Sequence, residues 1–151
     1  MTAAASAPVL FAYDGSELAK LAIDEAGALI GAGRDAIVAC VWQPFDVGFV
    51  PAEGLRFDAA DPADVRRAAE QTAAEGASLG EAAGFRHSRG TAIEAASAWR
   101  GIIDVADEHD AAVIVLGSHG HTGLAGVLLG SVAAAVAAHS RRTVMITHRR
   151  S

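Results

Sequence analysis

The feature that most constrains the fold is a series of short apolar runs, rich in Val, Ile and Leu, that alternate with segments of helical periodicity. Four of these runs show little polar alternation, which is typical of parallel strands covered on both faces. They occupy residues 8–14, 36–42, 111–117 and 143–148. A fifth run, 84–90, is polar and alternating, and it is expected to be an exposed edge strand. The helical patterns occupy residues 16–32, 61–83, 98–110 and 131–140.

This alternation of strand and helix predicts right-handed crossovers and a parallel sheet with helices on both faces. A chain of 151 residues with this pattern is expected to form one doubly wound α/β domain, 1–151. The tail at 1–7 is expected to be flexible, and an irregular flap at 43–60 holds three phenylalanines. The flap is interpreted either as a surface segment whose phenylalanines pack onto the body or as a lid or dimer contact.

Two of the expected helices begin with N-terminal signals. Ser16 stands where an N-cap is needed, and Asp61 caps the next helix with Pro62 at its first helical position. In the first of these helices, Leu18 and Leu29 are expected to lie on the same broad apolar face.

Composition and charge exclude several classes of protein. Although 52% of the residues are hydrophobic, no window approaches the roughly 18 uninterrupted apolar residues of a membrane span. No signal peptide is recognised, so a cytoplasmic protein is expected. The single cysteine, Cys40, allows no internal disulfide and is interpreted as a small buried hydrophobe. The net charge of -6 argues against a nucleic-acid surface. Any anionic ligand must therefore be held by local dipoles and hydrogen bonds.

A glycine-rich loop follows the expected strand at 111–117. Gly117 ends that strand, and Gly120 follows three residues later, which leaves backbone amides open to a ribose or phosphate. Gly130 and Ser131 precede an alanine-rich helix whose first turn offers unpaired N–H groups and about half a positive charge. The alternative for Ser131 is plain helix capping. The loop is neither a Walker A loop nor a dinucleotide-binding fingerprint.

Two histidines, His119 and His121, lie in this loop. Imidazole binds several transition metals, but two histidines alone make a poor site, so no metal site is expected from the protein alone. The other interpretations are a partner for phosphate or a solvent-facing residue, and near neutral pH either ring could gain charge beside an anion.

The spacing Gly117-x-x-Gly120, nine further residues, then Gly130-Ser131 resembles the nucleotide-binding signature of the universal stress protein family. The resemblance covers nearly the whole chain, from an opening strand that ends in Asp14-Gly15-Ser16 to a short last strand after the helix that ends "AHSRR". It implies an open five-stranded sheet of order 3-2-1-4-5, the adenine nucleotide alpha hydrolase-like fold. It also implies binding of ATP, ADP or AMP, with Mg²⁺ held through the phosphates. One departure is "RGTAIEAASAW", which lacks the Gly-x-Pro that often follows the third strand in the family.

The resemblance also implies roles for individual residues. Ala12 and Asp14 would border the adenosine, and Val41 would pack on the adenine. The ribose and phosphates would be lined by Leu116, Gly117, His119 and Gly120. Amides and a hydroxyl would be presented to the phosphates by Gly130, Ser131 and Val132. Because a carboxylate repels phosphate, Asp14 is expected to face base or ribose donors, or to act through a divalent cation. Its alternative is a turn or capping carboxylate in "DGS".

The most direct functional interpretation is a regulatory, ATP-binding module of the stress response. In the family the last strand pairs across a two-fold axis, so a homodimer is expected. Its edge would be formed by Thr143, Val144, Met145, Ile146 and Thr147. One alternative is a slow ATP hydrolase, although no catalytic residue is recognised and no Walker lysine is present. The other is a dimeric interaction protein in which nucleotide is secondary. The partner protein is not indicated, and neither nucleic acid nor membrane is expected as a partner.

Overall fold

The apolar runs form the strands of one parallel sheet in the computed structural model, which describes residues 7–31, 33–43, 61–120 and 129–149. In chain order the elements are β1 (Val9–Ala12), α2 (Glu17–Ile30), β2 (Ala36–Trp42), α3 (Pro62–Ala82), β3 (Ser88–Glu94), α4 (Ala98–Glu108), β4 (Val113–Gly117), α5 (Ser131–His139) and β5 (Thr143–Thr147). Most of the expected tail and flap lies outside the described residues, as does His121.

The strand order is β3-β2-β1-β4-β5, and each neighbouring pair is parallel. The order implied by the family resemblance is therefore confirmed. It reverses between β1 and β4, which pair directly with Leu10 opposite Ile114. At this reversal the crossovers leave the sheet on opposite faces, and an open α/β sheet of this type offers its ligand crevice there.

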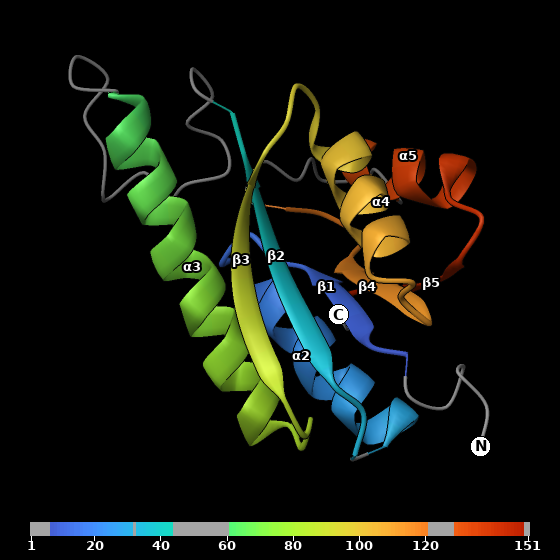
Figure 1. The fold of residues 1–151 in the computed structure, drawn as a ribbon. Coiled ribbons are helices and arrows are strands. Elements are labelled where there is room, and N and C mark those ends of the chain that lie inside the picture. Colours follow the sequence, from blue (N-terminus) through green and yellow to red (C-terminus); the bar gives the residue numbers. More distant parts are fainter. Residues whose placement is uncertain (1–6, 32, 44–60, 121–128, 150–151) are drawn as a thin grey trace.

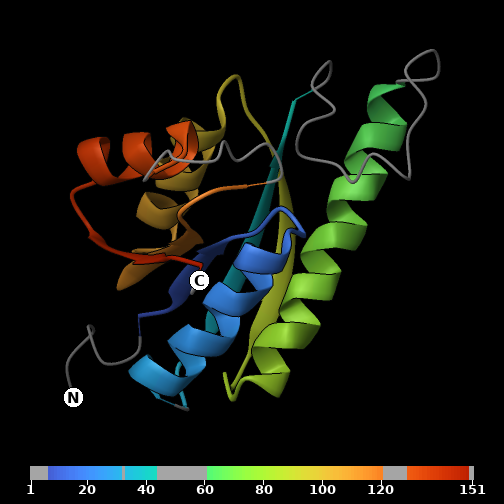
Figure 2. The ribbon, with the colours of Figure 1, turned by 180° about the vertical axis from the view of Figure 1, so that it is seen from behind.

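Helices cover both faces of the sheet, as predicted (Figure 1). Viewed from behind, α2 and α3 lie side by side across one face, and α4 and α5 lie on the other (Figure 2). Successive side chains of a strand point to opposite faces, so Phe11 of β1 packs in the cluster under α2, and Leu10 packs in the cluster under α4 and α5. Cys40 is fully buried against α3, which confirms its interpretation as a small core residue.

The predicted helix starts are confirmed. Ser16 has extended backbone geometry, and its Oγ accepts a hydrogen bond from the amide of Ala19 at 3.2 Å. The Oδ1 of Asp61 accepts one from the amide of Ala63 at 2.9 Å, with Pro62 as the first helical residue. Among the described residues, no helix has both the length and the apolar character needed to cross a membrane.

Two expectations were wrong. The edge strand starts at Ser88 rather than at 84, because Gly84 follows the end of α3 with φ 107° and Phe85 turns inward to make an edge-to-face contact with Phe11. Leu29 is 72% exposed rather than buried. The buried stripe of α2 includes Ala19, Ala22, Ile23 and Ala26. Leu18 is also buried, and Leu29 falls on the same face, but it lies in the last turn of the helix, after Ala26, the last buried residue.

Candidate functional site

The carboxyl ends of β1 and β4 bring two separate loops together. Asp14 is the second residue after β1, and Gly120 is the third residue after β4. A Cβ on Gly120 would lie only 2.6 Å from Oδ2 of Asp14, so the carboxylate lies directly against the glycine. The first and fourth strands thus place their terminal loops in contact at the reversal point of the sheet.

Asp14 also organises its own turn. Its Oδ1 accepts a hydrogen bond from the amide of Ser16 at 2.9 Å, and Gly15 between them has φ 82°. This is an Asx-type turn, in which the carboxylate replaces a backbone acceptor. The turn interpretation of Asp14 is therefore correct for one oxygen, while the other oxygen faces the glycine loop.

Ser118 ties the end of β4 to both neighbouring segments. Its amide donates to the carbonyl of Thr147 at 2.8 Å, and its carbonyl accepts from the amide of Gly130 at 2.7 Å. The residue is only 2% exposed. Ser118 was not singled out from the sequence. It is the first residue after an apolar strand and lies between two predicted site glycines, and this position could have drawn attention to it.

The start of α5 lacks a side-chain cap. Gly130 is the N-cap, with φ -69° and ψ 165°, and as a glycine it has no side chain to cap the first turn. Ser131 is exposed and is the first helical residue, so it does not fill the capping position. The carbonyl of Gly130 accepts from the amide of Ala134, which leaves the amides of Ser131 and Val132 without an intrahelical acceptor.

The ring of His119 lies over this helix start. Its Nδ1 is 3.1 Å from Oγ of Ser118, and its Cδ2 would lie 3.7 Å from a Cβ placed on Gly130. Its Nε2 is buried and has no hydrogen-bond partner among the described residues. The structure therefore brings Asp14, Gly120, His119 and Gly130 to one end of the sheet.

The remaining predicted residues lie on the α4 and α5 side of the same edge. Val41 and Leu116 are 3% and 4% exposed and belong to the apolar cluster under these helices. Ala12 and Val132 are partly buried and pack against the same cluster. Gly117 lies between this cluster and α2, because a Cβ there would be 3.0 Å from Cγ of Leu18.

Two groups near this edge have strongly shifted ionisation. Burial, followed by a hydrogen bond from its hydroxyl to Glu75, raises the pKa of Tyr13 far above its ordinary value. Burial raises the pKa of the Cys40 thiol to about 12, with a smaller contribution from Asp14. Both groups are therefore neutral near pH 7. The described part of the chain contains no cluster of three or more His, Cys, Asp or Glu side chains suited to a metal ion.

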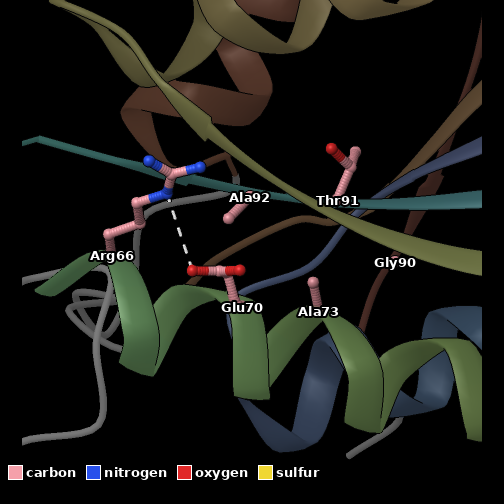
Figure 3. A pocket seen from close by; sticks show the side chains of 6 residues that line it. All are labelled: Arg66, Glu70, Ala73, Gly90, Thr91 and Ala92. Atoms are coloured by element: carbon pink, nitrogen blue, oxygen red, sulfur yellow. Dashed lines mark ion pairs between the residues drawn. The ribbon is translucent and has the colours of Figure 1, made fainter. Parts of the chain in front are cut away.

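A hollow of about 290 Å³ lies between α3 and the edge strand β3 (Figure 3). Its lining residues are Arg66, Glu70, Ala73, Gly90, Thr91 and Ala92. In the hollow, Nε of Arg66 and Oε1 of Glu70 are 3.6 Å apart, so the positive charge is already paired. None of the residues predicted for the site contributes to this hollow.

The fold and the carboxyl-edge site define a doubly wound α/β protein with a glycine-rich loop at the reversal point of its sheet. The chain belongs to the universal stress protein family, whose model matches residues 6–148. No curated protein matches the sequence.

Three solved structures illustrate the similarity. A universal stress protein in complex with cAMP is 26% identical, with 95% of this chain and 98% of that chain covered and a TM-score of 0.62. The hypothetical protein MJ0577, the subject of a structure-based assignment of biochemical function, is 21% identical, with 96% and 97% covered and a TM-score of 0.70. The universal stress protein from Archaeoglobus fulgidus in complex with dAMP is 19% identical, with 94% and 97% covered and a TM-score of 0.59. At these identities, the last two show the fold alone.

Proposed function

We propose that the protein binds an adenine nucleotide at the carboxyl edge of its sheet, with the phosphates at the start of α5. The observation that carries this proposal is the uncapped helix start, where Gly130 leaves the first amides without acceptors beside bare glycine backbone. Membership of the universal stress protein family supports it. So does the similarity to a family member described in complex with cAMP.

The groups at this end of the sheet suit a phosphate. The amides of Ser131 and Val132 have no intrahelical acceptor, and the Nε2 atom of His119 has no partner among the described residues. The exposed hydroxyl of Ser131 is on the first residue of the same helix. A Cβ on Gly130 would come within 3.2 Å of the carbonyl oxygen of Ser118, so glycine keeps this corner open. Hydrogen-bond donors and a helix dipole can hold an anion without a positively charged side chain, which fits a chain with a net charge of -6.

The adenosine would lie toward Asp14 and the ends of β1 and β2. Oδ2 of the Asp14 carboxylate lies against Gly120. Because a carboxylate repels phosphate, this position suits a contact with ribose or base better than one with phosphate. Ala12, Val41, Leu116 and Gly117 would form the apolar wall. ATP is the proposed nucleotide, with ADP and AMP as related ligands, and Mg²⁺ bound through the phosphates would neutralise part of their charge.

The role proposed for the protein is that of a regulator of the stress response, which acts as a homodimer paired through β5. This strand is one of the two edges of the sheet, and its central residues, Val144, Met145 and Ile146, are only partly buried. An apolar edge strand is stabilised when a second strand covers it. Sedimentation equilibrium should give twice the monomer mass of 15.3 kDa, and a monomer at every concentration tested would contradict the dimer.

The binding proposal is tested by Ser131→Asp. An acidic residue in the first turn of a helix stabilises it by about 0.3–1 kcal/mol, so the fold should be retained. The same carboxylate at about 4 Å from a phosphate costs about 1 kcal/mol in water and about 4 kcal/mol at an effective dielectric constant of 20. Calorimetric titration with AMP, ADP and ATP, with and without Mg²⁺, should therefore show affinity reduced by about tenfold or more.

Two control variants separate charge from position. Ser131→Asn keeps the size of the new side chain without its charge and should bind close to wild type. Ala137→Asp adds the same charge to an exposed position further along α5 and should also leave binding intact. Wild-type protein that binds none of the three nucleotides would refute the proposal, as would undiminished binding by Ser131→Asp.

A further inference from the structure

We propose that Ser118 fixes the tautomer of His119, so that its imidazole presents Nε2–H as a hydrogen-bond donor to the ligand's phosphate. This inference rests on the proposed nucleotide site and assigns a positioning role to a residue inside the loop. The juxtaposition that carries it is a buried serine hydroxyl 3.1 Å from Nδ1 of the ring, whose other nitrogen is buried and unpaired among the described residues.

Counting donors and acceptors selects between the two neutral tautomers. If the proton were on Nδ1, that atom would donate to Oγ of Ser118. The hydroxyl proton of Ser118 would then have no acceptor among the described residues, in a residue that is 2% exposed, and the lone pair on Nε2 would also be unpaired there. If the proton is on Nε2, the hydroxyl donates to Nδ1 and only Nε2–H lacks a partner. The second arrangement leaves fewer buried polar groups unsatisfied, so it is favoured.

The backbone holds Ser118 in the position that this role requires. Its amide donates to the carbonyl of Thr147 in β5 and its carbonyl accepts from the amide of Gly130 at the α5 start, so the backbone of Ser118 is held on both sides. The serine hydroxyl is therefore a fixed reference point from which the imidazole of the next residue is oriented. A partner that orients one ring nitrogen determines what the other can do.

The direction of the ring identifies the chemistry of the ligand atom. Cδ2 of His119, which is bonded to Nε2, lies over Gly130, the N-cap of α5. An imidazole N–H at this place joins the amides of the first helical turn, which have no intrahelical acceptor. A group that meets only donors must supply acceptors, and the three oxygens of a terminal phosphate do so. The nucleoside alone lacks these oxygens, so His119 should discriminate AMP from adenosine.

Two substitutions of His119 distinguish the ring nitrogens. The amide nitrogen of glutamine reaches the place of Nε2, whereas that of asparagine reaches only the place of Nδ1. In calorimetric titrations with AMP, His119→Gln should bind within about threefold of wild type, and His119→Asn should bind about tenfold more weakly. Adenosine affinity should be unchanged in both variants. Stronger AMP binding by the asparagine variant than by the glutamine variant would overturn the assignment.

The role of Ser118 is tested directly by Ser118→Ala, with Ser88→Ala as its control. Ser88 is a partly buried serine whose Oγ, unlike that of Ser118, has no partner among the described residues, and it lies in β3, outside the site. Ser118→Ala should weaken AMP binding by about three- to tenfold, as expected for one lost neutral hydrogen bond. Ser88→Ala should not change AMP binding. Equal AMP binding by Ser118→Ala and wild type would refute the positioning role.

The tautomer itself can be measured without any ligand. In a ¹⁵N-labelled sample at alkaline pH, the two imidazole nitrogens give separate signals, and the His119→Gln variant identifies those of His119. Wild type should carry the proton on Nε2, and Ser118→Ala should show a mixture of tautomers. A proton on Nδ1 in wild type would overturn this inference even if AMP binds. The expected tautomer without binding of AMP, ADP or ATP would instead overturn the proposed function and the ligand part of the inference, leaving only the role of Ser118 in fixing the tautomer.

Discussion

Replacing Gly90 with alanine should destabilise the protein by forcing α3 away from the sheet. A Cβ at this position would lie 2.5 Å from the carbonyl oxygen of Ala73, 2.6 Å from its carbonyl carbon and 3.0 Å from its Cβ. Non-bonded heavy atoms prefer separations of about 3.5–4.0 Å, so the helix would have to move by roughly 1 Å. That movement would loosen the contacts of Val65 and Ala69 with the strand residue Cys40, all of which are fully buried.

The size of the effect follows from two opposing terms. Overpacking a well-packed core costs about 1–3 kcal/mol. Replacing a glycine in a strand interior raises the free energy of unfolding by about 0.5–1 kcal/mol, because the unfolded chain loses conformational freedom. A net loss of about 1.5 kcal/mol in the free energy of unfolding is expected for Gly90→Ala. With a urea m-value of about 1.5 kcal/mol/M, the midpoint should fall by about 1 M without a change in m.

A second glycine, in α3, provides a matched comparison, because the atoms that a new Cβ would meet there belong to side chains rather than to the backbone. A Cβ on Gly76 in α3 would lie 2.6 Å from Cγ1 of Val38 and 2.8 Å from Cδ2 of Tyr13. Shortening Val38 to alanine should therefore make Gly76→Ala less costly, with a coupling energy of about 1 kcal/mol. Shortening Ala73 to glycine should not rescue Gly90→Ala, because the carbonyl group of that residue remains. Urea unfolding within about 0.5 kcal/mol of wild type for Gly90→Ala, or rescue by Ala73→Gly, would refute this reasoning.

Three further predictions concern the site and its supports. Gly120→Ala should weaken AMP binding about tenfold by displacing Asp14, and it should cost under threefold in an Asp14→Ala background, which a calorimetric double-mutant cycle measures. Burial raises the pKa of the Cys40 thiol from 9.0 to about 12, so the contribution of this neutral thiol to stability is complete below pH 9. Stability should therefore fall as the pH rises from 9 to 12, and urea unfolding should show a smaller fall in Cys40→Ala. Arg142→Ala loses contacts with two aspartates and with the carbonyl of Ala111 at 2.8 Å. It should reduce stability by about 1 kcal/mol, and equal urea midpoints would contradict this.

The sheet was predictable from sequence because its strands are covered on both faces. In β1, neighbouring residues such as Leu10 and Phe11 are both buried, one toward each helical layer. Continuous apolar runs therefore indicate these strands even without alternation. The starts of α2 and α3 were equally clear, since Ser16 and Asp61 act through local hydrogen bonds within three residues. The strand order, by contrast, came from the family resemblance.

The boundary of the edge strand could not be predicted from its own pattern. A polar, alternating segment has the same period of two wherever pairing begins, so residues 84–90 satisfied the pattern. In the structure the pairing starts with Ser88 opposite Ala36 and ends with Glu94 opposite Trp42. Phe85 is buried before the strand begins, which is a tertiary contact that the local pattern does not reveal.

Within the site, the spacing of glycines located the loop but did not show how the loop is held. Ser118 has the same residue type as many exposed loop serines, and its role depends on Thr147 and Gly130, which are 29 and 12 residues away in sequence. The unpaired Nε2 of His119 likewise depends on which side of the ring meets the serine. Such hydrogen bonds become visible only when the loop, β5 and the start of α5 are brought together.

The structure gives different physical reasons for the glycines at positions 120 and 130. From the sequence, both were interpreted as bare backbone for a ligand to approach. At Gly120 a Cβ would clash with the protein itself, because it would lie 2.6 Å from Oδ2 of Asp14. The other oxygen of that carboxylate accepts a hydrogen bond from the amide of Ser16. At Gly130 the nearest atom, the carbonyl oxygen of Ser118, is 3.2 Å away, so a small movement could accommodate alanine. Gly120 is therefore required for the contact between the β1 and β4 loops even without nucleotide. For Gly130, access for a ligand explains the glycine better than contacts within the protein do.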